Sequence, residues 1–274
     1  MGRDPTAPEP QGRPTVMDRR TFAISAAAAT AIAAFATPAE AASTAGTSST
    51  DRSKLRRQLL DTLAAELDDR ATAAVEVPRI MDVCLDWAPP TVALESVDFL
   101  LGYSFGNRAP ADGGDPAKVR YEPGPVNESL ADTVARIHRR RPVPVYAQWE
   151  IAHFLTTKHG LKDVTSIEPV VAPDGTITYL STYGVAAQVL GLRKHLPGGP
   201  GTAGVIGFRD HVKRRVLTTR LAGLPTAGAP AGHRMPGTYD PQSGQAWTRS
   251  RQLYLVHDMA AQLQMLEQQL IAGA

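Results

Sequence analysis

The chain has 274 residues, 43% of them hydrophobic, so it can form one sizeable core and is too apolar to be disordered throughout. Its 29 basic and 27 acidic residues give a formal net charge of +2, which argues against nucleic acid as a partner. The single cysteine, Cys84, excludes an intramolecular disulfide and a cysteine-based metal cluster, and we expect it to be a small buried residue.

The first 41 residues are predicted to lie outside the folded domain. Residues 1–16 are rich in proline, glycine and charge and are expected to be a disordered extension, so translation begins at either Met1 or Met17. Next comes the pair Arg19-Arg20, which one residue separates from Phe22. An alanine-rich apolar stretch follows, and residues 39–41 form a small-x-small cleavage site. This segment resembles a twin-arginine export signal.

The apolar stretch, residues 23–36, is shorter than the about 20 residues that a membrane-spanning helix needs. We therefore expect the twin-arginine export machinery as a partner, an extracytoplasmic or secreted protein, and no stable transmembrane span after cleavage. The alternative is an alanine-rich helix of the folded domain. Cleavage of the signal in the host is left open.

Residues 42–53 are predicted to be a linker because they are mostly serine, threonine and alanine, and residues 54–274 a single domain. The domain is expected to begin and end with amphipathic helices. The first, ending near Arg70, has a leucine every four residues, at Leu55, Leu59, Leu63 and Leu67. The last spans residues 246–271, with an expected buried face of Val256, Met259, Ala260, Leu263, Leu266 and Leu270.

Three apolar runs, residues 97–101, 143–146 and 203–208, each lead into a polar tip and then into helical periodicity. Such runs are typical of strands covered on both faces, and the alternation predicts an α/β fold: three layers, Rossmann-like, with a mainly parallel sheet and helices on both faces. Ligands of such sheets bind at the carboxyl ends of the strands, where the winding reverses.

The connecting elements follow from capping and turn residues. We expect helices capped by Asn127 and by Ser181 or Thr182, and a helix from 149 to 159 with Gly160 just after its end. A small hairpin is expected around residues 170–179 and a long surface loop from 107 to 125.

Ser104 lies in Gly102-Tyr103-Ser104-Phe105-Gly106, which has the GxSxG spacing of a nucleophile elbow. An elbow needs a helix directly after the serine, whereas the following GNRAPADGGDP would break one. Acyl hydrolysis by Ser104 with His211 or His257 as the base is therefore kept as an alternative.

His211 and Arg214 stand at the start of a predicted helix that follows a strand, and Lys213 and Arg215 lie beside them. Backbone N–H groups, an imidazole and a guanidinium at a strand tip suit an anion. The alternative is that Lys213 and Arg215 face water and His211 merely caps the helix.

Glu150 follows another strand and is a candidate general base or hydroxyl ligand, or a first-turn glutamate stabilised by the helix dipole. The sequence contains no standard metal motif and no GxGxxG or GxxxxGK[ST] loop. We therefore expect no metal site, and the sequence does not indicate which cofactor, if any, the chain binds.

These segments, in their order, resemble the bacterial envelope family that includes YdcF, SanA and ElyC. The resemblance is carried by Leu101-Gly102, Asn127-Glu128, Glu150-Ile151-Ala152, Ser181-Thr182-Tyr183 and the segment GFRDHVKR from Gly207 to Arg214. It covers about residues 97–270 and implies a Rossmann-like domain, a pocket at the strand tips and a role in the cell envelope.

Together these observations predict a polar, anion-binding pocket formed by Gly102, Ser104, Glu150, Thr182, His211 and Arg214. Glu150 or His211 is expected to act as acid or base, Arg214 to clamp the anion, and Ser104, Thr182 and Gly102 to contact the ligand. The expected ligand is a phosphorylated or nucleotide-like small molecule. A non-catalytic envelope binding protein is the other alternative, so whether the chain is an enzyme is left open.

Overall fold

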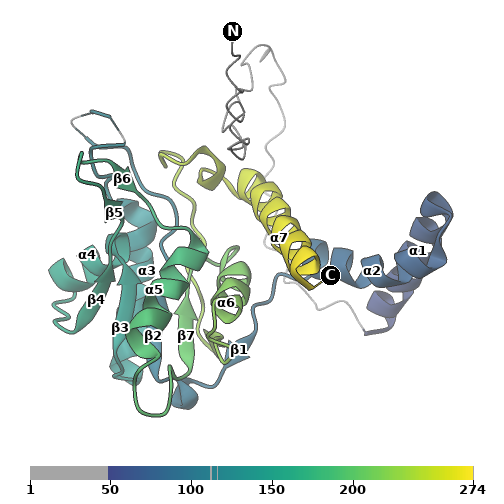
Figure 1. Cartoon of the computed structure of the whole chain (residues 1–274), viewed down its shortest axis with the longest axis horizontal. Coiled ribbons are helices and arrows are strands. Elements are labelled where there is room, and N and C mark those ends of the chain that lie inside the picture. Colours follow the sequence, from purple (N-terminus) through teal and green to yellow (C-terminus); the bar gives the residue numbers. More distant parts are fainter. Residues whose placement is uncertain (1–48, 112, 116, 274) are drawn as a thin grey trace, which may run out of the picture. The chain divides into compact units, whose positions relative to one another are not determined.

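The central sheet is formed by parallel strands in the order β4-β3-β2-β7 (Figure 1). The structure is a computed structural model that describes residues 49–111, 113–115 and 117–273. The strands are β2 (Phe99–Gly102), β3 (Val145–Gln148), β4 (Val164–Ile167) and β7 (Ala203–Ile206). In the register, Leu100 is opposite Val145 on one side and Gly204 on the other. Every residue of β2 and β7 is buried, as their continuous apolar sequence predicts.

Two short strands extend this sheet beyond β7. Strand β8 (Ala229–Pro230) pairs in parallel with β1 (Thr91–Val92), and Gly228, just before β8, forms a parallel bridge with Gly204 of β7. A Cβ at position 228 would lie 2.7 Å from Val92, so glycine is required for this close approach.

Helices cover both faces of the sheet. Helices α3 (Gly124–Arg140) and α4 (Trp149–Thr157) pack together on one face, and α5 (Thr182–Arg193) and α6 (Val212–Leu221) pack together on the other (Figure 1). From β2 the chain winds to β3 and β4, then returns to place β7 on the opposite side of β2. The expected three-layer α/β fold is confirmed, and the winding reverses between β2 and β7.

Several predicted boundaries were wrong. Strand β2 begins at Phe99 and includes Gly102, β3 begins at Val145, and β7 ends at Ile206. Strand β4 was not predicted because it lies at the edge of the main sheet and its sequence, VTSI, has only one fully buried residue. The hairpin is confirmed as the antiparallel pair β5 (Val170–Val171) and β6 (Ile177–Thr178).

The predicted cap of α3 is also wrong, and α4 ends at Thr157, two residues before the predicted 159, with Lys158 as its C-cap. The predicted cap of α5 is confirmed. Helix α3 begins at Gly124, so Asn127 lies inside it, fully buried. Ser181 caps α5 by accepting a hydrogen bond from the N–H of Gly184 at 3.1 Å. Gly160 follows α4 with φ +65°, as a C-terminal glycine requires.

The helices at the two ends of the described chain are less buried than predicted. Helix α1 (Ser49–Leu67) starts within the predicted linker and has no buried residue, so its leucine stripe covers no core. It packs on α2 (Arg70–Leu85), where Cys84 is only half-buried. Helix α7 (Arg251–Gly273) buries Tyr254, Asp258 and Gln262 instead of the expected apolar face, and Val256 is 66% exposed.

The predicted extension, export signal and most of the linker, residues 1–48, lie outside the described residues. Within the described part, no helix is both long enough and apolar enough to cross a bilayer. Two one-turn 3₁₀ helices, Leu94–Ser96 and Ala246–Thr248, complete the elements of that part.

Candidate functional site

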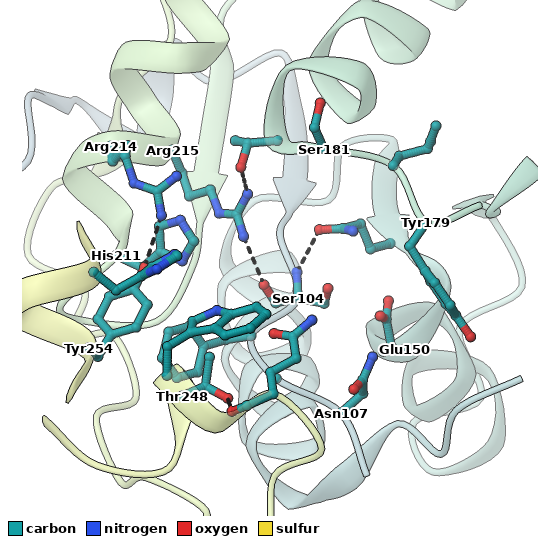
Figure 2. Close-up of a pocket in the computed structure, with 18 residues that line it drawn as sticks. Ser104, Asn107, Glu150, Tyr179, Ser181, His211, Arg214, Arg215, Thr248 and Tyr254 are labelled. Atoms are coloured by element: carbon teal, nitrogen blue, oxygen red, sulfur yellow. Dashed lines mark hydrogen bonds between the residues drawn. The ribbon is translucent and has the colours of Figure 1, made fainter. Parts of the chain in front are cut away.

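A cavity of about 310 Å³ lies at the carboxyl end of the sheet, where the winding reverses between β2 and β7 (Figure 2). The residues that line it are Ser104, Phe105, Gly106, Asn107, Gln148, Glu150, Tyr179, Leu180, Ser181, Thr182, His211, Arg214, Arg215, Gln245, Trp247, Thr248, Tyr254 and His257. They come from the loop after β2, the tip of β3, the segment between β6 and α5, the first turns of α4, α5 and α6, and the segment from 245 to 257. Three helix N-termini therefore meet at this cavity, each with a partial positive charge.

The loop after β2 is held in place by its neighbours. The Ser104 N–H donates to Gln148 Oε1 at 2.9 Å, and the Phe105 N–H donates to Asn127 Oδ1 at 2.9 Å. The same Asn127 donates from Nδ2 to the Gly106 carbonyl at 2.7 Å. From inside α3, the buried Asn127 side chain thus holds the loop after β2 that lines the cavity, and it does not cap the helix.

Arg215 reaches into the cavity between α5 and β2. Its guanidinium donates to the Thr182 hydroxyl and, at 3.2 Å, to the Ser104 carbonyl, and it lies over the Tyr103 ring at 5.0 Å. All of these partners are uncharged, and Nε has no partner. Burial, reinforced by the charge of Arg214, lowers the pKa of Arg215 to about 10. The charges of Asp258 and Glu150 act on this guanidinium, but neither carboxylate forms a salt bridge with it, so the cation lacks the direct partner that buried ions normally have.

Arg214, in contrast, is paired with an acid. Its Nε donates to Asp258 Oδ1 at 2.6 Å, and a terminal nitrogen donates to the Tyr254 hydroxyl at 3.2 Å. The side chain of Asp258 is 1% exposed and also accepts from Tyr254 and Gln262. Arg214 therefore lines the cavity but connects α6 to α7 through this ion pair.

His211 occupies the N-cap position of α6, but its side chain makes no capping hydrogen bond. It is 5% exposed, and its ring is edge-to-face with Phe105 at 5.8 Å between centroids. Neither ring nitrogen has a hydrogen-bond partner. Burial, together with the charges of Arg215 and Arg214, holds the pKa of His211 well below its ordinary value. The ring is therefore neutral at neutral pH, with one donor and one acceptor nitrogen free.

Glu150 lies in the first turn of α4 and is 3% exposed. Burial raises the pKa of Glu150 to about 7, against the opposing effects of its own backbone N–H, the Ser104 hydroxyl and Arg215. Its Oε2 has no partner. A carboxyl that titrates near neutral pH and faces a cavity has the properties of a general acid or base.

The mouth of the cavity carries an aromatic side chain. Trp247 is 43% exposed and stacks on His257 with ring centroids 5.3 Å apart. Its segment is tied to the β2 loop, because the Gly244 N–H donates to the Asn107 carbonyl at 2.7 Å. The segment from 243 to 248 therefore forms a fixed edge of the cavity.

Five of the six residues predicted for the site line this cavity: Ser104, Glu150, Thr182, His211 and Arg214. Gly102 does not, because it ends β2 beneath α4, where a Cβ would lie 3.4 Å from Ala147 and Ile151. The sequence reasoning missed Arg215 as a site residue. The same reasoning left open that Lys213 faces water, but it is 5% exposed and donates to the carbonyls of Asp82 and Asp86.

The elbow geometry of a serine hydrolase is absent from the described chain around Ser104. No helix follows this serine until α3 begins at Gly124, and the Ser104 hydroxyl interacts with Glu150, while both nitrogens of His211 are unpartnered. Among the described residues, no group of three or more His, Cys, Asp or Glu side chains is arranged to hold a metal ion.

Comparisons with known proteins assign no family to this fold and cavity. No family model matches the chain, and no curated protein and no solved structure is significantly similar to it. The resemblance to the family of YdcF, SanA and ElyC therefore stays a prediction, and the function has to be argued from the geometry of the cavity.

Proposed function

We propose that this chain is an exported cell-envelope protein that binds a small phosphorylated molecule in the cavity at the strand tips. The observation that carries the proposal is the buried guanidinium of Arg215, which makes no salt bridge within the described part of the chain. A phosphate group would supply the missing negative charge.

The two neighbouring arginines support this assignment by their difference. Both side chains extend from α6 and line the cavity. Arg214 is neutralised by Asp258, whereas Arg215 contacts only a hydroxyl, a carbonyl and an aromatic ring. Transferring an unpaired charge out of water is unfavourable, so such a residue is expected where a ligand brings the opposite charge. A guanidinium also matches phosphate by two parallel hydrogen bonds.

The other groups around Arg215 favour an anion too. The N-termini of α5 and α6 lie at the cavity, where Thr182 and His211 line it, and the dipole of each helix favours a negative charge there. His211 adds a free ring nitrogen, which becomes a second cationic donor if the ring takes up a proton beside a bound dianion. Arg215 thus replaces Arg214 as the anion clamp.

Glu150 is the residue at which a proton would be exchanged with the bound molecule. It shares Ser104 with Arg215: the hydroxyl of that serine interacts with Glu150, and its carbonyl accepts from Arg215. An acid or base therefore lies one residue away from the proposed phosphate site. Its pKa of about 7 suits proton transfer in either direction at neutral pH.

The proposed location rests on the arginine pair and cleavage site in residues 19–41, and the family on the order of short segments. Neither supports a particular reaction.

The test is isothermal calorimetry of the full chain with inorganic phosphate and a panel of phosphate monoesters. We expect Arg215→Met to weaken phosphate binding by about ten- to a hundredfold, since a charge-assisted contact contributes about 1.5 to 3 kcal/mol. Arg215→Lys is expected to recover only part of this affinity because an ammonium lacks the planar fork.

The matched control is Arg139→Met, which removes the same charge from an exposed position in the last turn of α3. Equal loss in both variants would mean that net charge, and not the cavity, attracts phosphate. Unchanged binding in Arg215→Met would refute the proposed site.

A further inference from the structure

Buried polar atoms without hydrogen-bond partners are concentrated in one place. Eight such side-chain atoms occur in the described part of the chain, and five of them belong to residues that line the cavity: Asn107 Oδ1, Glu150 Oε2, both ring nitrogens of His211, and Arg215 Nε. Native proteins satisfy most of their buried polar groups, so a cluster of unsatisfied groups around one cavity indicates a ligand that completes them.

These atoms are divided by type between two sides of the cavity. Figure 2 shows Arg215 and His211 on one side of Ser104, and Glu150 and Asn107 on the other. The first side offers the N–H of Arg215 Nε and one N–H of the neutral His211 ring, beside two helix N-termini. The other His211 nitrogen is an acceptor, which becomes a donor when the ring takes up a proton beside a bound dianion. The second side offers two oxygen acceptors, one from the carboxyl of Glu150 and one from the amide of Asn107. A bare phosphate would satisfy the first side and leave the second unpaired.

The group that satisfies the acceptor side must donate hydrogen bonds, and its charge can be argued from Glu150. Because the pKa of Glu150 is about 7, this carboxyl is present in both protonation states at neutral pH. A hydroxyl can donate to the carboxylate and can also accept from the protonated acid, whereas an ammonium can only donate. The acceptor side therefore favours a hydroxyl.

The size and the wall of the cavity limit the rest of the ligand. A volume of about 310 Å³ is at the lower end of the range for small-molecule sites. The exposed ring of Trp247 provides an apolar surface at the mouth. These limits favour a compact ligand, of the size of a single sugar or a single nucleoside.

We propose that the ligand is a small phosphate monoester that carries a free hydroxyl group, with its phosphate beside Arg215 and His211 and its hydroxyl beside Glu150 and Asn107. This inference rests on the proposed function and names the substrate class of that site. A sugar or polyol phosphate and a nucleoside monophosphate share this chemistry.

The test compares two phosphate esters with the same three-carbon chain, glycerol 3-phosphate and n-propyl phosphate, by calorimetry on the full chain. Only the first has hydroxyl groups. We expect it to bind about tenfold or more tightly, because n-propyl phosphate leaves the acceptor side desolvated and unpaired. Equal affinity for the two esters would overturn the inference.

Two variants of Glu150 test where the hydroxyl binds. Glu150→Leu removes the acceptor and is expected to abolish the preference for glycerol 3-phosphate, whereas Glu150→Gln keeps an acceptor of the same shape and retains a preference. A preference that persists unchanged in Glu150→Leu would overturn the assignment of the hydroxyl side. If Glu150→Leu does not fold, the comparison of the two esters on the unmodified chain still tests whether the ligand needs a hydroxyl group.

These outcomes are separate from failure of the proposed function. If neither ester nor inorganic phosphate binds, or if all bind equally well to Arg215→Met, the proposed phosphate site itself is refuted. If phosphate binds through Arg215 but the two esters do not differ, only the further inference fails. If glycerol 3-phosphate is preferred as expected, comparing ribose 5-phosphate with adenosine 5′-monophosphate distinguishes the two sources: tighter binding of the nucleotide identifies a nucleotide, and equal or weaker binding a sugar phosphate.

Discussion

Replacing Arg214 by methionine should destabilise the fold, whereas replacing Arg215 should change its stability little, although the two residues are adjacent in α6. Arg214→Met leaves Asp258 buried without its cation; the pair is 2.6 Å apart, and the two side chains are 13% and 1% exposed. Breaking a buried pair costs about 3 to 5 kcal/mol. Because Tyr254 and Gln262 still donate to Asp258, we expect the lower value, about 3 kcal/mol.

Arg215→Met removes a cation that has no carboxylate partner in the described chain, and the groups it frees face the cavity. Its unfolding free energy is expected to change by less than about 1 kcal/mol, because apolar replacement of a buried charge is often neutral.

The assay is thermal and urea unfolding at neutral pH, followed by circular dichroism. For a domain of this size, about 3 kcal/mol corresponds to a fall of about 6 to 12 °C in Tm. The double variant Arg214→Met, Asp258→Leu should regain much of the loss, since it removes both charges. Equal destabilisation by Arg214→Met and Arg215→Met would refute the division of roles between them.

Three further predictions test other parts of the chain. Since burial raises the pKa of Glu150 from 4.5 to about 7, the folded state binds the proton more tightly, and stability should fall by about 3 kcal/mol as pH rises from about 4.5 to 7. In Glu150→Gln this fall should disappear from the pH profile of the unfolding free energy, and an unchanged profile would contradict the assignment. Changing Arg19 and Arg20 to lysine should leave a full-length precursor inside the cell, as immunoblots of cell fractions would detect; efficient export of that variant would rule out the signal. A serine-reactive fluorophosphonate should not label the chain, and labelling that is lost in Ser104→Ala would establish the hydrolase alternative.

The layered fold was predictable because its central strands are buried on both faces and their apolar runs are continuous. The edge strand β4 was not predicted because Thr165 is exposed and Val164 and Ser166 are only half-buried, so its sequence has no continuous apolar run. The buried face of α7 was misjudged for a related reason. Its buried positions are Tyr254, Asp258 and Gln262. Asp258 binds Arg214, Tyr254 and Gln262. A method that searches for a periodic apolar stripe does not detect such a buried polar network.

The sequence allowed us to predict that the site lies at the strand tips, but not which side chains in it form hydrogen bonds or ion pairs with each other. Ser104, Glu150 and His211 were found because each follows a strand. The choice between Arg214 and Arg215 depends on Asp258, which lies more than 40 residues later in another helix. Asn107 comes from a loop whose sequence shows no pattern. Trp247 was placed in the predicted helix 246–271, but it lies in the 3₁₀ helix Ala246–Thr248 before α7 begins at Arg251, and the contact of its segment with Asn107 brings it to the cavity.

The position of β7 next to β2 has a consequence for how the chain folds. Asp98 and Thr202, which are hydrogen-bonded at the base of this pair, are 104 residues apart in the chain. Closing so long a segment costs more chain entropy than pairing β2 with β3, and contacts between distant segments slow folding. Ser104 and Arg215 come from opposite sides of that late contact. A partly folded chain that has assembled β2, β3 and β4 would have no binding cavity, so a ligand can recognise only molecules that have completed the last step.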